Sequence, residues 1–329
     1  MAEVVRYVDP DATGAGDGTS WTDAYTSLSA WNAGEATNLV TDGDWHHVYC
    51  RSSSGTADTT GFTITGWTTG ASNYILIEAA ENHEAIPDEW DATRYRLSPT
   101  SATAIQISEE YVRILGLQLS VAANNVYCVR VAAGAIGASN DIRVLNCRCE
   151  GVTTAGSGQR GITIADADVN LTVENTVVLD MGGDGINVNC SADIYNCVVY
   201  NSGFDGIEYE SGGSGNVTNC AVFDSVSGDD FDIDAGATVT ISNCASDDGT
   251  GTNPVSPSGG SWSNEFTDYT NGDFTILGTG NLWDGGTPVS GITHDMIGNA
   301  YDGTTPSIGV VQFQGDARIV ILRRRIEGC

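Results

Sequence analysis

The chain has 329 residues, of which 40% are apolar, so it is long enough to bury the core of one large domain or of a repeat array. It carries 43 acidic and 13 basic side chains, which gives a formal net charge of −30, and every basic one is arginine. A negative field of this size repels nucleic acid and anionic membranes, which excludes both as expected partners.

The first 110 residues predict short strands and turns. The 41 glycines and seven prolines of the chain favour strands separated by turns over long helices. No basic region followed by an apolar run opens the sequence, so we expect no secretory signal, and no apolar stretch of about 18 residues predicts a membrane span. The strands predicted here are WHHVYC (45–50), FTIT (62–65) and YILIEA (74–79).

A six-residue pattern then recurs along the middle of the chain. Its copies are ILGLQL (114–119), VLNCRC (144–149), VENTVV (173–178), IYNCVV (194–199), VTNCAV (217–222) and ISNCAS (241–246). The third position, the anchor, is Gly116 in the first copy and Asn in the others, and successive anchors lie 21 to 30 residues apart. Residues on either side alternate with a period of two, which predicts strands with one buried face across a bend.

A second short strand follows in each unit, after a turn such as Gly183-Asp184-Gly185. These strands are VRV (129–131), ITI (162–164), INV (186–188), IEY (207–209) and FDI (231–233). Their outer residues are apolar, so we expect each coil of the chain to place at least two short strands around a common interior. Units of this length without helical periodicity predict a parallel β-solenoid.

On these I/V-x-N-C/T-x-V and D-G-I-x-V units, between residues 112 and 246, the chain resembles the right-handed parallel β-helix (pectin-lyase-like) family found among phage virion and bacterial surface proteins. The resemblance implies an all-β fold with an asparagine ladder at the sharp bend of each coil. Asparagine also tolerates the left-handed backbone that such a bend needs. The residues that match the ladder are Asn146, Asn175, Asn196, Asn219 and Asn243.

We expect three parts: an N-terminal cap (1–35), the parallel β-helix (36–250) and a C-terminal closing segment (251–329). A cap is needed because a terminal coil exposes apolar side chains and unpaired backbone. The closing segment ends in a tail that is either a strand with solvated arginines or an attachment strand that docks on an acidic partner subunit. The arginines of this attachment tail are Arg318, Arg323, Arg324 and Arg325.

Four cysteines follow anchors directly, namely Cys147, Cys197, Cys220 and Cys244. Parallel strands in register lie about 4.8 Å apart with side chains pointing the same way, which is poor disulfide geometry, and a linear stack cannot form a tetrahedral zinc site. We therefore predict free, buried thiols and no metal site. The ninth cysteine, Cys329, is the expected exposed thiol, and its disulfide state stays open.

Two acidic columns are the best candidate site. The outward central residues of the second strands are Arg130, Thr163, Asn187, Glu208 and Asp232. Glu208 and Asp232 should lie one coil apart, close enough to raise one pKa and form a hydrolase pair, or to bind Ca²⁺. Beside them runs a turn column, expected to face a glycan or a cation, of Asp184, Asp205 and Asp229.

The composition offers an alternative to a catalytic role. With 43 carboxylates on one chain, columns of stacked acids are also expected by chance. A third column, Asp180, Asn201, Asp224 and Asp248, has no evident function. Lyases of this fold place Arg or Lys near Ca²⁺-binding acids, and the coils here offer few such bases. We therefore predict no cofactor, with Ca²⁺ as the one ion that the columns suggest.

The sequence-based hypothesis is a structural protein on a virion surface or outside a cell, such as a phage capsid decoration, spike or fibre component, with weak glycan binding. The alternatives are a polysaccharide lyase or glycoside hydrolase acting on the β-helix face, and a bacterial surface adhesin or filament subunit. The expected partners are other subunits of a particle, reached through the C-terminal tail, and a glycan. We also expect a homo-oligomer.

Overall fold

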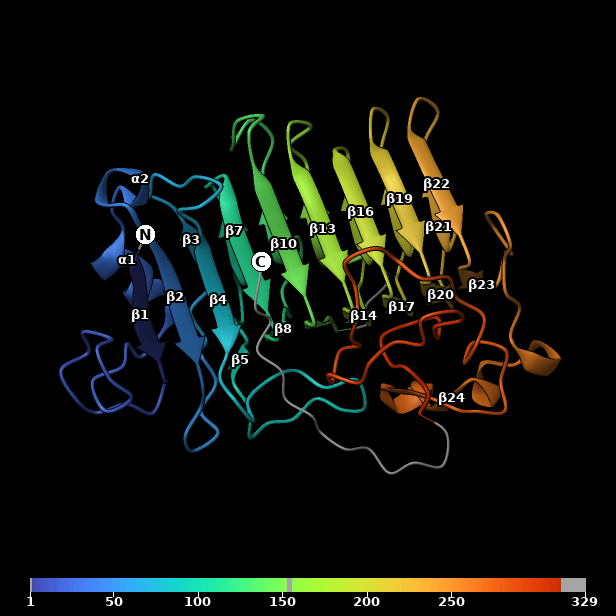
Figure 1. The fold of residues 1–329 in the computed structure, drawn as a ribbon, viewed down its shortest axis with the longest axis horizontal. Helices are drawn as coiled ribbons and strands as arrows, with labels where there is room; N and C mark the ends of the chain where they lie inside the picture. The colour runs from blue at the N-terminus through green and yellow to red at the C-terminus, as the bar shows by residue number, and fades with distance from the viewer. Residues whose placement is uncertain (1, 153–155, 315–329) are drawn as a thin grey trace.

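Three parallel sheets form the body of the protein in a computed structural model that describes residues 2–152 and 156–314. Sheet 1 has nine strands whose order in space is their order in the chain, as the front of Figure 1 shows. Its strands are β1 (Ala2–Val8), β2 (Asp44–Cys50), β4 (Ile75–Ala79), β7 (Tyr111–Leu115), β10 (Asp141–Leu145), β13 (Asn170–Glu174), β16 (Ser191–Tyr195), β19 (Ser214–Thr218) and β22 (Thr238–Ser242).

Sheets 2 and 3 each have seven strands. Sheet 2 contains β5 (Arg96–Leu97), β8 (Gln118–Ser120), β11 (Arg148–Glu150), β14 (Val177–Leu179), β17 (Val198–Tyr200), β20 (Ala221–Phe223) and β23 (Ala245–Ser246). Sheet 3 contains β3 (Phe62–Ile64), β6 (Ile105–Ile107), β9 (Tyr127–Val131), β12 (Arg160–Ile164), β15 (Ile186–Val188), β18 (Ile207–Tyr209) and β21 (Phe231–Ile233). One coil visits the three sheets in turn, so the fold is the predicted right-handed parallel β-helix.

The anchor bend divides the first predicted strand of each coil into a sheet 1 strand and a sheet 2 strand. The anchors take a left-handed backbone conformation, with φ of 48° to 57° at the asparagines and 72° at Gly116. Asn175 donates a hydrogen bond to Asn146 Oδ1 (3.1 Å), and Asn219 donates one to Asn196 Oδ1 (3.0 Å). The ladder is therefore built of two bonded pairs, while the last anchor donates to the Gly285 carbonyl.

Inward side chains of the three sheets fill the helix interior. Fully buried members include Val144, Val173, Ile194 and Val217 of sheet 1, Leu119, Val178, Val199 and Val222 of sheet 2, and Val129, Ile162, Ile186 and Ile207 of sheet 3. Each such side chain contributes about 1.5–3 kcal/mol by leaving water. The four cysteines after the anchors are buried beside this core and unpaired, as are all the cysteines of the described residues, which confirms the predicted free thiols.

The N-terminal end of the interior is covered by helix α1 (Leu28–Glu35), which precedes the short helix α2 (Leu39–Asp42). Ser27 caps α1 by accepting a hydrogen bond from the Ala30 amide (3.0 Å). Leu28 and Trp31 are fully buried, and the Trp31 ring stacks on that of Trp67 with centroids 5.3 Å apart. Among the described helices none is long and apolar enough to cross a membrane.

The described part of the predicted closing segment, residues 251–314, lies mainly along the outer face of sheet 2. Its elements are η1 (Ser258–Gly260), η2 (Trp262–Asn264), β24 (Phe266–Asp268), η3 (Tyr269–Asn271) and β25 (Asp273–Ile276). Trp262, Phe266 and Phe274 form a second core with Val198 and Phe223 of sheet 2. The expectation that sheet 2 strands bury one face is therefore wrong, because this segment covers the other face as well.

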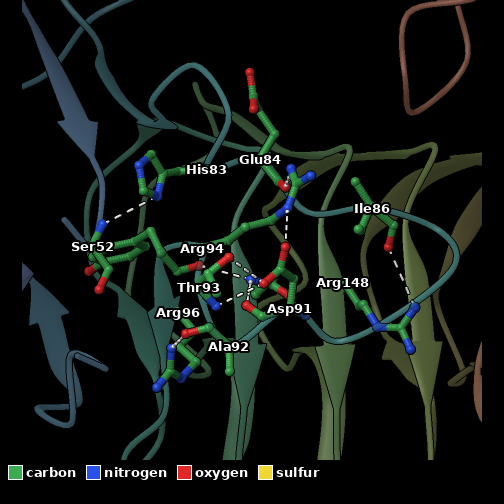
Figure 2. A network of polar contacts seen from close by, with 12 residues as sticks. Ser52, His83, Glu84, Ile86, Asp91, Ala92, Thr93, Arg94, Arg96 and Arg148 are labelled. Carbon is green, nitrogen blue, oxygen red and sulfur yellow. Dashed lines mark hydrogen bonds and ion pairs between the residues drawn. The ribbon is translucent and has the colours of Figure 1, made fainter. Parts of the chain in front are cut away.

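Arg148 of β11 connects the closing segment to an earlier loop through hydrogen bonds. Its side chain is 2% exposed, and Nη1 donates to the carbonyls of Pro87 (3.3 Å) and Gly272 (3.0 Å). Figure 2 shows Arg148 reaching the loop at Ile86, beside the network in which Arg94 binds Asp91. One buried guanidinium thus joins sheet 2, the loop at residues 86–87 and η3.

Candidate functional site

The predicted acidic columns lie on the outer face of sheet 3 and on the turn that leads into it. Strand register pairs Asn187 with Glu208 and Glu208 with Asp232, as the repeat predicts. The turn column is also stacked, because the amides of Gly185 and Gly206 donate to the Asp205 and Asp229 carbonyls, each at 2.9 Å.

The glycines that follow Asp184 and Asp205 are required by the close approach of the next coil, whereas Asp229 is followed by Asp230. A Cβ on Gly185 would lie 2.3 Å from Val199 Cγ1, and a Cβ on Gly206 would lie 2.3 Å from Val222 Cγ1. Neither contact is sterically possible, so any other residue would push the coils apart. The two Asp-Gly pairs therefore fix the positions of Asp184 and Asp205 in their turns.

Three carboxylates converge at this turn. One oxygen each of Asp184, Asp205 and Glu208 lies within 4.8 Å of the other two. Asp184 is almost fully buried, with 3% of its side chain exposed, and the other two are half-buried. Glu208 is thus grouped with the turn column, while Asp229 and Asp232 lie outside the three-carboxylate cluster.

Hydrogen bonds hold the cluster in place. Asn187 Nδ2 donates to Glu208 Oε2 and, at 3.1 Å, to Glu210 Oε1. The Asp229 amide donates to Asp205 Oδ1 (2.8 Å), and the Asp205 amide lies 3.4 Å from Asp184 Oδ1. The carboxylates are therefore oriented by the backbone of successive coils and by one buried amide.

The local electrostatics raise the pKa values of Glu208 and Asp184. Burial first, and then the nearby Asp184, Asp205 and Glu210 carboxylates, raise the pKa of Glu208 to about 7, although the hydrogen bond from Asn187 lowers it. Burial also raises the pKa of Asp184, against the effect of the Arg160 guanidinium. The pKa of Asp232 is raised by burial and by Asp205. A group that ionises near neutral pH lies at the centre of the site.

Arg160 is the site residue that the sequence columns miss. Its Nε lies 2.7 Å from Asp184 Oδ2, and its register partner on β9 is Tyr127. Arg130, one coil before Thr163 in the outward column, lies over the Tyr127 ring, with its guanidinium carbon 4.9 Å from the centroid. The sequence shows an arginine at the start of β12. The strand pattern alone does not predict which aspartate this arginine contacts.

The cluster fits a hard divalent cation. Two ligands of one Ca²⁺, at about 2.3–2.6 Å each, can be at most about 5 Å apart, and the three carboxylates meet this condition. The donors are all oxygen, which suits Ca²⁺ or Mg²⁺ better than zinc. Asp184 Oδ2 is moreover buried without an aligned hydrogen bond. Asp184, Asp205 and Glu208 would hold the ion.

The predicted ladder asparagines lie away from the three-carboxylate cluster. The ladder asparagines lie at the opposite end of sheet 2 strands from the acidic turn, and three of them contact the C-terminal segment: Asn175, Asn219 and Asn243. The attachment-tail arginines and Cys329 fall outside the described residues.

A comparison with protein families agrees with the fold over part of the chain. Residues 133–259 match a family model described as "Right handed beta helix region". Among solved structures, a rhamnogalacturonan lyase aligns with 74% of this chain and 68% of its own, at 13% identity and a TM-score of 0.48. The pectate lyase Pel9A aligns with 94% of this chain and 96% of its own, at 14% identity and a TM-score of 0.47. No curated protein matches the sequence.

Proposed function

We propose that this right-handed parallel β-helix protein is displayed on a surface and binds an acidic glycan through a divalent cation on sheet 3. The observation that carries the proposal is the convergence of Asp184, Asp205 and Glu208, whose oxygens lie within 4.8 Å of one another. A bound Ca²⁺ would neutralise this cluster and offer open coordination positions to carboxylate oxygens of the glycan.

Two arginines of sheet 3 suit the remaining anionic groups of such a glycan. Arg160 pairs with Asp184 of the cluster and is in register with Tyr127 of the neighbouring strand, and the Arg130 guanidinium lies over the Tyr127 ring. Guanidinium groups bind carboxylates with paired hydrogen bonds. These two arginines would therefore attract an acidic chain to a protein whose formal net charge of −30 otherwise repels it.

The test is equilibrium binding to uronate-containing and neutral glycans, in Ca²⁺ and in EDTA. We expect Ca²⁺-dependent binding of the acidic glycans alone, lost in Asp205→Asn. Asp193→Asn is the matched control, because Asp193 lies on sheet 1 and accepts a hydrogen bond from the exposed Asn216. Glycan binding that is unchanged in EDTA would refute the proposal. So would a loss of binding in Asp193→Asn equal to that in Asp205→Asn.

A second candidate is cleavage of the bound glycan by a lyase or hydrolase reaction. The observation that favours it is the pKa of Glu208, raised to about 7, with Asp232 as its register partner. A carboxyl group near this value can donate a proton at neutral pH and accept one in turn. Turnover lost in both Glu208→Gln and Asp232→Asn would support this candidate, and turnover retained in both would exclude the pair.

A structural role in a particle, as a phage capsid decoration, spike or fibre component, or as a bacterial adhesin or filament subunit, is the third candidate. Unbroken strand pairing from β1 to β22 favours it, because a continuous ladder makes a rigid body with few exposed edges. We expect deletion of residues 317–329 to abolish incorporation into the particle. Normal incorporation of the truncated chain would rule out the tail as the attachment strand.

A further inference from the structure

Arg160 and the proposed cation compete for the same carboxylate. Arg160 Nε lies 2.7 Å from Asp184 Oδ2, yet the N–H is not aligned with that oxygen, which has a charged neighbour but no hydrogen bond. The contact is therefore an ion pair without an aligned hydrogen bond, unlike a bidentate clamp. A divalent ion bound by Asp184 would approach this guanidinium and repel it.

The two partners differ in freedom to move. The Asp184 side chain is 3% exposed, while that of Arg160 is 32% exposed. Asp184 is also held by its turn, where its Oδ1 accepts from the Asp205 amide. If the pair separates, the arginine must be the partner that moves.

We propose that Arg160 is a built-in counter-ion of the cation site, which leaves Asp184 when the cation binds and then contacts an anionic group of the glycan. This inference rests on the proposed cation site and concerns how that site is regulated. Before any ligand arrives, the guanidinium acts only through Asp184, and after cation binding it contacts the glycan itself.

The surroundings of Arg160 suit the second position. On the same strand, Thr163 is 4% exposed, and its Oγ1 is buried without a hydrogen-bond partner. Across the sheet, Tyr127 stands in register with Arg160 and is already contacted by the Arg130 guanidinium. A released Arg160 would thus remain over sheet 3, where an acidic chain held by the cation would pass. The order of binding follows: cation first, glycan second.

The experiment is a calorimetric titration of Ca²⁺ into the full chain at pH 8, comparing wild type with Arg160→Gln. Removing the competing charge should tighten Ca²⁺ binding by about fivefold, as expected for a partly exposed ion pair. Arg143→Gln is the matched control, because Arg143 is 33% exposed and its Nε lies 2.9 Å from Asp141 on another face. Its Ca²⁺ affinity should equal that of wild type.

Arg160→Met keeps the apolar stem and provides a second variant if Arg160→Gln fails to fold. In the same variants, glycan affinity at saturating Ca²⁺ should fall, opposite in direction to the change in Ca²⁺ affinity. Equal Ca²⁺ affinity in wild type and in the folded Arg160 variant would overturn the inference while leaving the cation site intact. Absence of Ca²⁺ binding in both would overturn the cation site itself, and the inference with it.

Discussion

In five of the six repeat units, one asparagine serves both the backbone and the hydrogen-bond network at the bend. Asn219 has a φ of 57°, a conformation that costs a residue with a Cβ about 1–2 kcal/mol. Its side chain donates to Asn196 Oδ1 and to the Thr287 carbonyl (2.8 Å), and accepts from the Thr287 amide (2.9 Å). The sequence predicts the bend but not the contact with Thr287, since 68 residues separate the two.

We expect Asn219→Ala to lower the free energy of unfolding by about 3 kcal/mol, from backbone strain and lost hydrogen bonds together. Asn219→Gly removes the same hydrogen bonds without the strain, so it should lose about 1 kcal/mol less. Urea unfolding measures both values. Equal losses in the two variants would contradict a strain contribution.

The pKa of Glu208 sets the pH dependence of cation binding. Only the ionised carboxylate is a ligand, and its pKa is raised to about 7. Ca²⁺ affinity should therefore increase from pH 6 to pH 8 and level off above, while Glu208→Gln should bind weakly with little change over this range. Calorimetry at three pH values measures the effect, and a wild-type affinity that is constant from pH 6 to pH 8 would exclude Glu208 as a ligand.

Period-two alternation in the sequence predicts the strands of each coil. It does not predict that the closing segment packs on the outer face of sheet 2. The predicted strands at 45–50, 62–65 and 74–79 correspond to β2, β3 and β4. One feature of the sequence indicates that the closing segment covers sheet 2. The outward residues Val177 and Val198 are apolar, where a face in contact with water would be polar. Arg160 was missed for a related reason: its contact depends on a turn whose length varies from coil to coil.

The covering segment should depend strongly on Arg148. Replacing it by Met leaves Glu150 without its 2.7 Å ion pair and three carbonyls without their donor, so we expect a loss of about 3 kcal/mol. Arg143→Met, on the surface of sheet 1, should change stability by less than about 1 kcal/mol. Hydrogen exchange of residues 262–276 should rise in Arg148→Met alone. Unchanged exchange there would show that the second core holds the segment without the arginine.

For the whole molecule, buried carboxyl groups make stability decline as pH rises. Burial raises the pKa of Glu109 and of Glu174 to about 7 and that of Asp230 to about 6. Unfolded carboxyl groups ionise near pH 4, so between about pH 4 and pH 7 the folded chain binds more protons than the unfolded chain. Stability from these groups is complete below this window and is lost as pH rises through it.

In EDTA, the thermal unfolding midpoint should therefore be several degrees higher at pH 5.5 than at pH 8. Repulsion among the charges behind the formal net charge of −30 acts in the same direction. Glu174→Gln should reduce the difference, because the amide cannot ionise. A midpoint that rises with pH would mean that ion pairs, and not buried acids, dominate the titration.

Whether Asp184, Asp205 and Glu208 form one cation site on sheet 3 is measured by calorimetric titration of Ca²⁺ into wild type and Asp205→Asn at pH 8. We expect one ion per chain bound well above the diffuse background of an acidic protein, and the loss of that ion in Asp205→Asn. Superimposable isotherms for the two proteins would contradict this expectation.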